Sequence, residues 1–228
     1  MKTAVIIPAF NEEQSIGKVI DDIPDKSDKI VLVCNNGSTD NTEKEALNAG
    51  AMVLTENRKG YGYACLKGIQ FLKELPSPPE YVVFMDGDYS DFPIQMNDLL
   101  HQVEVNNYDL VIGSRAMGNN ERGSMTLPQR FGNWLSGFLI GIIYRQEVSD
   151  LGPFRAIKWN RLLELNMQDK TYGWTVEMQA KAIKKGFSYH EIPVDYRKRI
   201  GKSKVSGTVK GTLLAGIKII YTIIKYAK

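Results

Sequence analysis

The sequence predicts an α/β fold in which a mostly parallel central sheet is flanked by helices. Short apolar runs alternate with segments of helical periodicity through the first half of the chain. Glycine-containing or polar turns separate these segments at regular intervals. The length of 228 residues suits one large domain, and a composition with 43% hydrophobic and 24% charged residues is typical of a globular protein.

The first half of the chain alternates expected strands with expected helices. Apolar runs typical of strands lie at residues 3–7, 29–34, 51–54, 81–85 and 109–113. Segments with apolar residues at helical spacing lie between them, at residues 12–22, 39–49, 61–73 and 93–105. Because a helix between two strands lets them pair in parallel, this order predicts a mostly parallel sheet covered by helices.

The second half departs from this rhythm. Residues 116–126 are polar and glycine-rich, which predicts a loop, and residues 128–144 predict a long, mostly apolar helix. Residues 150–155 lead into another strand, followed by a helix at 174–184 and a strand at 188–194. A basic loop at 196–206 precedes an amphipathic helix at 207–228. We therefore expect one domain at residues 1–206 with a C-terminal helix appended.

Charge and cysteine content limit the partners and the compartment. The net charge of +3 is too small to indicate nucleic acid, but nine basic and no acidic residues follow position 196, which favours a phosphate or a membrane surface as partner. Cys34 and Cys65 lack metal-ligand spacing, so we expect buried thiols in a reducing compartment. Without a signal peptide or a long apolar span, the sequence predicts a cytoplasmic protein and leaves a peripheral membrane contact open.

A pair of acids, Asp86 and Asp88, follows the apolar run 81–85. In open α/β sheets, ligands bind beyond the carboxyl ends of the strands. Two carboxylates within one turn suit Mg²⁺ or Mn²⁺, ions that commonly bridge to a substrate diphosphate. Taken alone, this Asp-x-Asp pattern is equally compatible with an acidic surface loop.

Three more loops with binding chemistry follow expected strands. Asn11 either offers its amide to a ligand or caps the next helix, and adjacent Asn35 and Asn36 either read a nucleobase or shape a turn. Lys59 stands beside Gly60 in a loop that suits a phosphate close to the backbone, or a solvated basic turn. Because all four loops should meet at one edge of the sheet, together they predict a site for a nucleoside diphosphate held through a divalent ion.

In their order, these motifs resemble the family 2 glycosyltransferases of the GT-A fold, above all dolichol-phosphate mannose synthase and bacterial polyprenyl-phosphate glycosyltransferases. The resemblance covers nearly the whole chain, and its matching pieces are Ile7-Pro8-Ala9-Phe10-Asn11-Glu12, Asn36-Gly37-Ser38-Thr39-Asp40, Lys59-Gly60-Tyr61-Gly62, Asp86-Gly87-Asp88, Gly113-Ser114-Arg115, Asp150-Leu151-Gly152-Pro153-Phe154-Arg155, residues 174–177, Glu191-Ile192-Pro193-Val194 and residues 197–206. It implies a single GT-A domain that moves a sugar from a nucleotide-diphosphate sugar to a polyprenyl phosphate. Inversion at the sugar and dependence on Mg²⁺ or Mn²⁺ are implied as well.

The resemblance also implies roles for individual residues. Asp86 and Asp88 would hold the metal, and Arg115 and Arg130 would hold the acceptor phosphate. The implied donor-binding residues are Pro8, Phe10, Asn11, Glu12, Asn36, Lys59, Asp86, Arg199 and Lys202. Relatives usually carry two aspartates where Asn35 and Asn36 stand, which leaves the base of the donor open. Many relatives also append membrane-spanning helices, where this chain has one amphipathic segment.

The need for a proton acceptor depends on the acceptor substrate. An ionised phosphate needs no base, whereas a hydroxyl must lose its proton to a carboxylate, for which Asp150 is the catalytic candidate beside Asp88. Alternatively, Asp150 caps a turn or pairs with Arg155. A hydroxyl acceptor on a small molecule or a protein is the alternative substrate. A non-catalytic nucleotide-sugar binding protein is the alternative class, and the Pro8-Ala9-Phe10-Asn11 turn argues against a nucleotidyltransferase.

The role of the C-terminal helix stays open among a membrane interface, packing on the core and an oligomer contact. The oligomeric state is not predicted. Apolar Trp134, Phe138, Ile140 and Ile143 in the earlier helix could add to a membrane surface, but a core role is favoured for them. His101 and His190 are isolated in the sequence, which predicts surface or packing roles for both.

Overall fold

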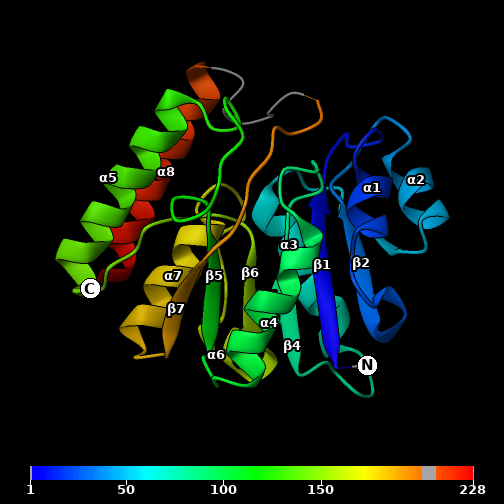
Figure 1. Ribbon diagram of the computed structural model, residues 1–228, viewed down its shortest axis with the longest axis horizontal. Helices are drawn as coiled ribbons and strands as arrows, with labels where there is room; N and C mark the ends of the chain where they lie inside the picture. Colours follow the sequence, from blue (N-terminus) through cyan, green and yellow to red (C-terminus); the bar gives the residue numbers. More distant parts are fainter. Residues whose placement is uncertain (1, 202–208, 228) are drawn as a thin grey trace.

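The computed structural model describes residues 2–201 and 209–227 and has a central seven-stranded sheet of order β3-β2-β1-β4-β6-β5-β7 (Figure 1). The prediction of a mostly parallel sheet is confirmed, because only β6 runs antiparallel to its neighbours β4 and β5. The strands are β1 (Thr3–Ala9), β2 (Lys29–Asn35), β3 (Met52–Thr55), β4 (Tyr81–Phe84), β5 (Leu110–Ser114), β6 (Arg155–Lys158) and β7 (Tyr189–Pro193).

Helices connect the strands and cover both faces of the sheet (Figure 1). Two of them, α3 and α7, have the bounds expected from the sequence, whereas α6 was not expected as a separate helix. The helices are α1 (Ile16–Asp21), α2 (Thr42–Asn48), α3 (Tyr61–Lys73), α4 (Met96–Glu104), α5 (Leu127–Tyr144), α6 (Trp159–Leu165), α7 (Trp174–Lys184) and α8 (Val209–Ala227), with single 3₁₀ turns at Lys26–Asp28 and Pro93–Gln95.

The core lies on both faces of the sheet. Successive side chains of β1 point to opposite faces, so that Val5 and Ile7 pack on one side with α1, α2 and α4, while Ala4 and Ile6 pack on the other with α3, α6 and α7. Burial on both faces explains why the strands are continuous apolar runs. Cys34 and Cys65 lie in this core as buried free thiols, as predicted.

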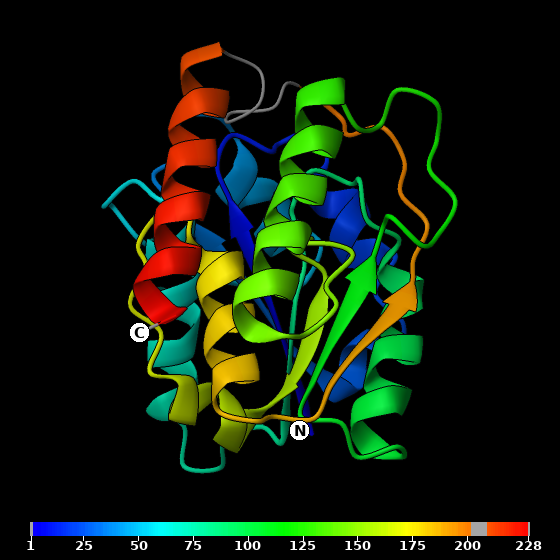
Figure 2. The same ribbon diagram turned by 90° about the vertical axis from the view of Figure 1, so that its left-hand side faces the viewer.

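Helices α5 and α8 lie side by side at one end of the sheet (Figures 1 and 2). Their inner sides share a cluster that includes Ile140 and Ile223, both fully buried. Polar contacts also fix α8: the Tyr144 hydroxyl donates to the Ile223 carbonyl at 2.7 Å, and Lys218 Nζ lies 2.8 Å from an Asp169 carboxylate oxygen. One side of α8 therefore packs on the domain, which was one of the alternatives for this helix.

The outer sides of the two helices are exposed. The core role favoured for Trp134 and Phe138 is wrong, because their side chains are 61% and 53% exposed, and Ile143 is 37% exposed. Ile140 alone of the four apolar residues is fully buried. Within residues 2–201 and 209–227, no helix combines the length and the apolar character that crossing a membrane requires.

Candidate active site

A cavity of about 560 Å³ opens at the carboxyl edge of the parallel strands. The loops that follow β1, β2, β3 and β4 all reach it, as their parallel order predicts. Most of the residues that the sequence analysis selected line this cavity: Pro8, Phe10, Glu12, Asn36, Lys59, Asp86, Asp88, Arg115 and Arg199. Helices α5 and α8 close the opposite wall with Gln129, Gly132, Asn133, Ala215, Gly216 and Ile219.

Three carboxylates crowd the loop after β4. Asp88 is 4% exposed and Asp91 is 2% exposed, and Asp91 accepts the backbone N–H of Asp86 at 3.3 Å. Burial raises the pKa values of Asp86 and Asp91, and the charge of Asp88 raises both further. Sequence reasoning missed Asp91. Its position five residues after Asp86, in the same loop, was the signal that could have indicated a third acid.

Asp86 and Asp88 offer the carboxylate oxygens that a divalent cation such as Mg²⁺ or Mn²⁺ prefers. Asp88 already contacts a cation, because a guanidinium nitrogen of Arg199 lies 2.5 Å from its Oδ2. The second Asp88 oxygen accepts from the backbone and the hydroxyl of Ser90. No group of three or more His, Cys, Asp or Glu side chains in the described part of the chain could hold a metal ion. An ion at Asp86 and Asp88 would therefore need further oxygen ligands from a substrate or from water.

A basic segment lies across the acidic loop. The Arg197 guanidinium stacks on the Tyr89 ring, 3.2 Å from its centroid, and donates to the Tyr89 carbonyl at 2.6 Å. The backbone N–H of Ile200 donates to the Asp88 carbonyl at 2.9 Å. These contacts hold Arg199 next to Asp88. Lys202, predicted to bind the donor, lies outside the described residues.

The glycines near Lys59 allow a close approach of the chain's own backbone. A Cβ on Gly60 would lie 2.2 Å from the Lys170 carbonyl oxygen, and a Cβ on Gly62 would lie 2.1 Å from that of Asp169. The chain's own backbone therefore approaches both glycines closely, and Gly60 also lines the cavity. Lys59 itself lines the cavity, with its Nζ 4.6 Å from the centroid of the Phe10 ring.

The Asn36 amide is largely committed to the protein. Its Nδ2 donates to the carbonyls of Glu56 and Arg58 at 3.1 and 2.7 Å, and its Oδ1 accepts from the Gly60 backbone at 2.7 Å. Both amide protons are used, so only one lone pair of Oδ1 is left for a nucleobase. Asn35 likewise bonds to the protein, donating to Glu43 of α2 at 3.2 Å.

Asn11 connects two loops of the site. Its Oδ1 accepts from the backbone N–H of Thr39 at 2.8 Å, which ties the loop after β1 to the loop after β2. It is not among the residues that line the cavity. It does not cap the next helix, because α1 begins at Ile16 with Ser15 before it. Its predicted donor contact is therefore without support from this geometry.

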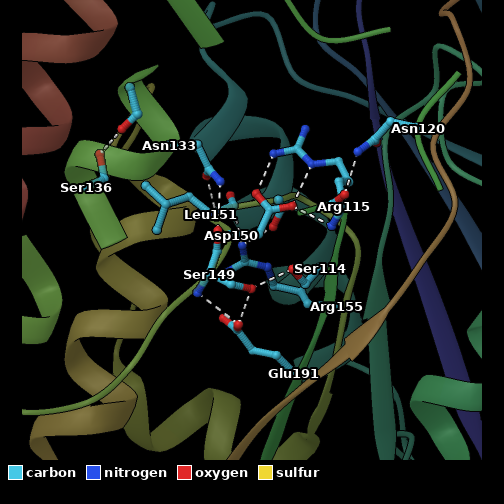
Figure 3. Close-up of polar contacts among 12 residues, drawn as sticks. Ser114, Arg115, Asn120, Asn133, Ser136, Ser149, Asp150, Leu151, Arg155 and Glu191 are labelled. Carbon is cyan, nitrogen blue, oxygen red and sulfur yellow. Dashed lines mark hydrogen bonds and ion pairs between the residues drawn. The ribbon is translucent and has the colours of Figure 1, made fainter. Parts of the chain in front are cut away.

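Asp150 and Arg115 form a buried, bidentate ion pair (Figure 3). Arg115 Nε lies 2.8 Å from Asp150 Oδ2 and Nη2 lies 2.7 Å from Oδ1, and the Arg115 backbone also donates to Oδ2 at 2.7 Å. Burial alone would raise the pKa of Asp150, but the charge and the hydrogen bonds of Arg115 outweigh it and lower this pKa. This geometry does not support the proton-acceptor role predicted for Asp150.

The alternative partner predicted for Asp150 was Arg155, and this pairing is wrong. Arg155 is fully buried and donates to backbone carbonyls, that of Thr175 at 2.9 Å and that of Gly152. In the same network, Asn133 of α5 donates to the Ser149 carbonyl and accepts from the Leu151 backbone, each at 2.9 Å (Figure 3). The segment around Asp150 thereby fixes α5 against the sheet.

Arg130 lies in a different cavity from Arg115. It lines a cavity of about 670 Å³ on α5, together with Trp134, Phe138 and Ile142. The two cavities share two lining residues, Met125 and Asn133. The two arginines predicted to hold an acceptor phosphate are thus in adjacent cavities rather than in one.

Comparison with known proteins identifies the family. The sequence profile of "Glycosyl transferase family 2" matches residues 4–170. An uncharacterized glycosyltransferase from Mycobacterium bovis is 31% identical over 92% of this chain and 93% of its own length. A dolichyl-phosphate hexose transferase from Haloferax volcanii is 28% identical over 92% of this chain and 90% of its own.

The fold also matches a solved enzyme structure. Glucosyl-3-phosphoglycerate synthase from Mycobacterium tuberculosis, crystallised with Mn²⁺, uridine diphosphate and phosphoglyceric acid, superposes with a TM-score of 0.75. The match covers 99% of this chain and 78% of the other at 20% identity, and therefore bears on the fold alone. From its matching profile, its relatives and the arrangement of its site, the chain belongs to glycosyltransferase family 2 and is a glycosyltransferase.

Proposed function

We propose that this glycosyltransferase moves a hexosyl group from a nucleotide-diphosphate sugar to a polyprenyl phosphate, with inversion at the sugar C1. The observation that carries the proposal is the cavity at the carboxyl edge of the sheet. It combines the acidic loop of Asp86 and Asp88 with the cations Lys59, Arg115 and Arg199. Such a mixture suits a donor diphosphate that reaches the protein together with a divalent ion.

On the donor side, Pro8, Phe10 and Asn36 border the nucleoside in this proposal. Asp86 and Asp88 hold Mg²⁺ or Mn²⁺, which when bound offsets the charge of the leaving diphosphate. Lys59 and Arg199 line the same cavity and add positive charge near the diphosphate. Arg199 must exchange its contact with Asp88 for one with the diphosphate when the ion binds.

On the acceptor side, a phosphate fits better than a hydroxyl. An ionised phosphate oxygen attacks C1 without a general base, and the one predicted base, Asp150, is held in its ion pair with Arg115. The acceptor wall of the cavity is largely apolar, with Met125, Leu151, Ala215 and Ile219. The relative named a dolichyl-phosphate hexose transferase supports a lipid phosphate. A peripheral contact with the cytoplasmic face of a membrane is part of this proposal.

A small phosphorylated acceptor is the second candidate. The matching solved structure holds phosphoglyceric acid, so the same fold accommodates such an acceptor. Sugar transfer to a hydroxyl of a small molecule or a protein would require a proton acceptor other than Asp150. The apolar residues of the acceptor wall favour the lipid phosphate over both alternatives.

The test is a transfer assay with the full chain. Uridine and guanosine diphosphate sugars are first screened with Mn²⁺ for thermal stabilisation, since a bound donor raises the unfolding temperature. Release of nucleoside diphosphate is then measured with a polyprenyl phosphate in detergent, with 3-phosphoglycerate, and without acceptor. We expect release that depends on the polyprenyl phosphate and on the metal. Release with 3-phosphoglycerate alone would refute the lipid acceptor, and donor binding without release would refute transfer.

A further inference from the structure

The hydroxyl of Tyr61 is buried at the edge of the active-site cavity. Tyr61 is the first residue of α3, and it lines the cavity together with Asp86. Its hydroxyl oxygen is inaccessible to solvent, and no atom of residues 2–201 and 209–227 forms a hydrogen bond with it. Buried tyrosine hydroxyls normally have a partner, because burial without one costs free energy. The Tyr61 hydroxyl therefore needs an acceptor from a neighbouring side chain or a ligand.

The backbone around Tyr61 has little room to move. The glycines before and after it pack against the backbone of residues 169 and 170, with no space for a Cβ at either glycine. The backbone N–H of Tyr63 also donates to the Lys170 carbonyl at 3.2 Å. The Tyr61 ring packs against the apolar cluster on the face of the sheet that α3, α6 and α7 cover. These contacts hold the ring in place, so an acceptor has to come to the hydroxyl.

Three side chains act electrostatically on the Tyr61 hydroxyl: Asp86, Cys65 and Arg155. Burial raises the pKa of Tyr61, the negative charge of Asp86 raises it further, and the positive charge of Arg155 lowers it. A guanidinium has no lone pair to accept a hydrogen bond, and a thiol accepts only weakly. Of these three side chains, Asp86 carries the strong acceptor. Because the pKa of Tyr61 is raised, the hydroxyl keeps its proton at neutral pH and is available as a donor.

The protein orients Asp86 and Asp88 in different ways. One oxygen of Asp88 accepts from the backbone N–H of Ser90 at 3.0 Å and from the Ser90 hydroxyl, and the other lies 2.5 Å from Arg199. Asp86 donates its backbone N–H to Asp91, and its carboxylate has no donor nearby in the described ranges apart from the Tyr61 hydroxyl. A carboxylate that binds a metal is usually oriented by a hydrogen bond from a second residue. Tyr61 is the residue placed to orient Asp86.

We propose that Tyr61 is a positioning residue for the metal site, whose hydroxyl donates to one oxygen of Asp86 and leaves the other oxygen for the ion. The inference rests on the metal site of the proposed function and is independent of the acceptor. Without metal, the hydroxyl has no partner, which lowers the stability of the folded chain. When Asp86 is ionised and turned toward an ion, the hydrogen bond forms and this cost disappears. Tyr61 therefore favours the metal-bound protein over the metal-free protein.

Metal affinity is the first test. Tyr61→Phe removes the hydroxyl and keeps the ring. The matched control is Tyr63→Phe, also on α3, whose ring lies 4.5 Å from the guanidinium carbon of Arg58 and is not among the residues that line the cavity. Calorimetric titration with Mn²⁺ is done with uridine or guanosine diphosphate, whichever stabilises the wild-type chain more. We expect Tyr61→Phe to bind Mn²⁺ about tenfold more weakly or less, and the control to bind like the wild-type chain. Equal affinity in all three proteins would overturn the proposal.

Stability without metal separates a positioning role from a structural one. If the hydroxyl were structural, Tyr61→Phe would be less stable than the wild-type chain. A buried hydroxyl without a partner predicts the opposite, because its removal leaves no polar group unsatisfied. We therefore expect urea unfolding of metal-free Tyr61→Phe at the same or a higher urea concentration than for the wild-type chain. A clear shift to lower urea concentration would contradict the positioning role.

Transfer rates show whether the hydroxyl acts through the metal. The Tyr61→Phe variant should need about tenfold more Mn²⁺ for half-maximal transfer, and its rate should approach that of the wild-type chain at saturating Mn²⁺. A rate that stays low at saturation, with unchanged Mn²⁺ dependence, would assign Tyr61 to the reaction itself and refute the proposal. A wild-type chain that binds Mn²⁺ but transfers no sugar would refute the proposed function, and the titration would still decide the role of Tyr61. A wild-type chain that binds no Mn²⁺ would refute both.

A crystal structure with Mn²⁺ and the nucleoside diphosphate gives the geometry directly. The Tyr61 hydroxyl oxygen should lie about 2.7 Å from one carboxylate oxygen of Asp86. An ion bound at Asp86 with the Tyr61 hydroxyl beyond hydrogen-bond distance of that carboxylate would contradict the proposal.

Discussion

The two walls of the cavity are built in opposite ways. Around the donor site, charged groups form ion pairs within the protein, as in the contact of Asp88 with Arg199 and the neighbouring pair of Asp150 with Arg115. On the acceptor wall, α5 and α8 contribute uncharged residues such as Gly132, Gly216 and Ile219, and the outer sides of the same helices expose apolar side chains to water. Buried charges need partners, whereas exposed apolar groups mark a surface that another body covers. The charges beside the donor site thus have partners within the protein at these two pairs, whereas the outer sides of α5 and α8 are uncovered.

The largest expected effect comes from removing a donor-wall carboxylate. Asp88→Asn should lower transfer by about 10³-fold, because the amide no longer balances a metal ion at the diphosphate. The matched control is Asp98→Asn, at an exposed position of α4, which should leave transfer unchanged. Initial rates of nucleoside diphosphate release measure both. Near-normal transfer by the Asp88 variant would place the metal chemistry elsewhere and remove the contrast between the walls.

The pair of Asp150 with Arg115 tests whether a donor-wall charge is structural or catalytic. Asp150→Asn should lower the free energy of unfolding by about 3–5 kcal/mol, because it leaves the buried Arg115 without its counter-charge. Arg115→Met should cost a similar amount, and the double variant should cost less than the two together. Urea unfolding measures all three. A stable Asp150→Asn variant with no turnover would instead establish the catalytic base.

Substitution of Arg199 tests whether its guanidinium competes with the metal ion for the Asp88 carboxylate. Arg199→Gln should bind Mn²⁺ about tenfold more tightly in the absence of nucleotide, because no guanidinium then competes for Asp88. The same variant should transfer sugar more slowly, since Arg199 is also proposed to contact the diphosphate. Lys198→Gln, at a side chain 59% exposed, is the control. Calorimetric titration gives the affinities, and an unchanged Mn²⁺ affinity would show that Arg199 does not compete.

The smallest expected effect is on the pH dependence of stability without metal. Burial raises the pKa values of Asp86 and Asp91 in the folded protein. In the unfolded chain, the ordinary pKa of an aspartate is about 4. Between about pH 4 and the raised pKa values, the folded protein therefore binds more protons than the unfolded chain. Their contribution to stability is therefore present below about pH 4 and is lost as the pH rises through the raised values. The loss should be on the order of 1 kcal/mol per pH unit. The unfolding temperature should fall less steeply between pH 5 and 8 for Asp91→Asn than for the wild-type chain. An equal slope in the two proteins would contradict this prediction.

Binding of a metal should reverse this pH trend. A cation at Asp86 and Asp88 requires the ionised carboxylates, so its binding releases protons and strengthens as the pH rises. The stabilisation by Mn²⁺ should accordingly be greater at pH 8 than at pH 6.

The sequence predicted the donor wall better than the acceptor wall, for a physical reason. The loops with Pro8, Lys59 and Asp88 follow parallel strands, and the carboxyl ends of parallel strands lie at one edge of the sheet. These loops therefore meet regardless of the conformations of their side chains. The partner of Asp150 depends on which cation the fold brings near it, and spacing along the chain favoured Arg155 where the structure has Arg115. The exposed side of α5 was not predicted because large apolar residues at helical spacing indicate a core-facing side as readily as an exposed one.

The most direct test of the central claim is to locate manganese by anomalous scattering in crystals grown with Mn²⁺ and a nucleoside diphosphate. We predict a peak next to Asp86 and Asp88, with the diphosphate as a further ligand and the Arg199 guanidinium moved from Asp88 to a phosphate oxygen. Nucleotide bound in the cavity with the Asp88–Arg199 contact intact, and no manganese within coordination distance of either carboxylate, would contradict the account.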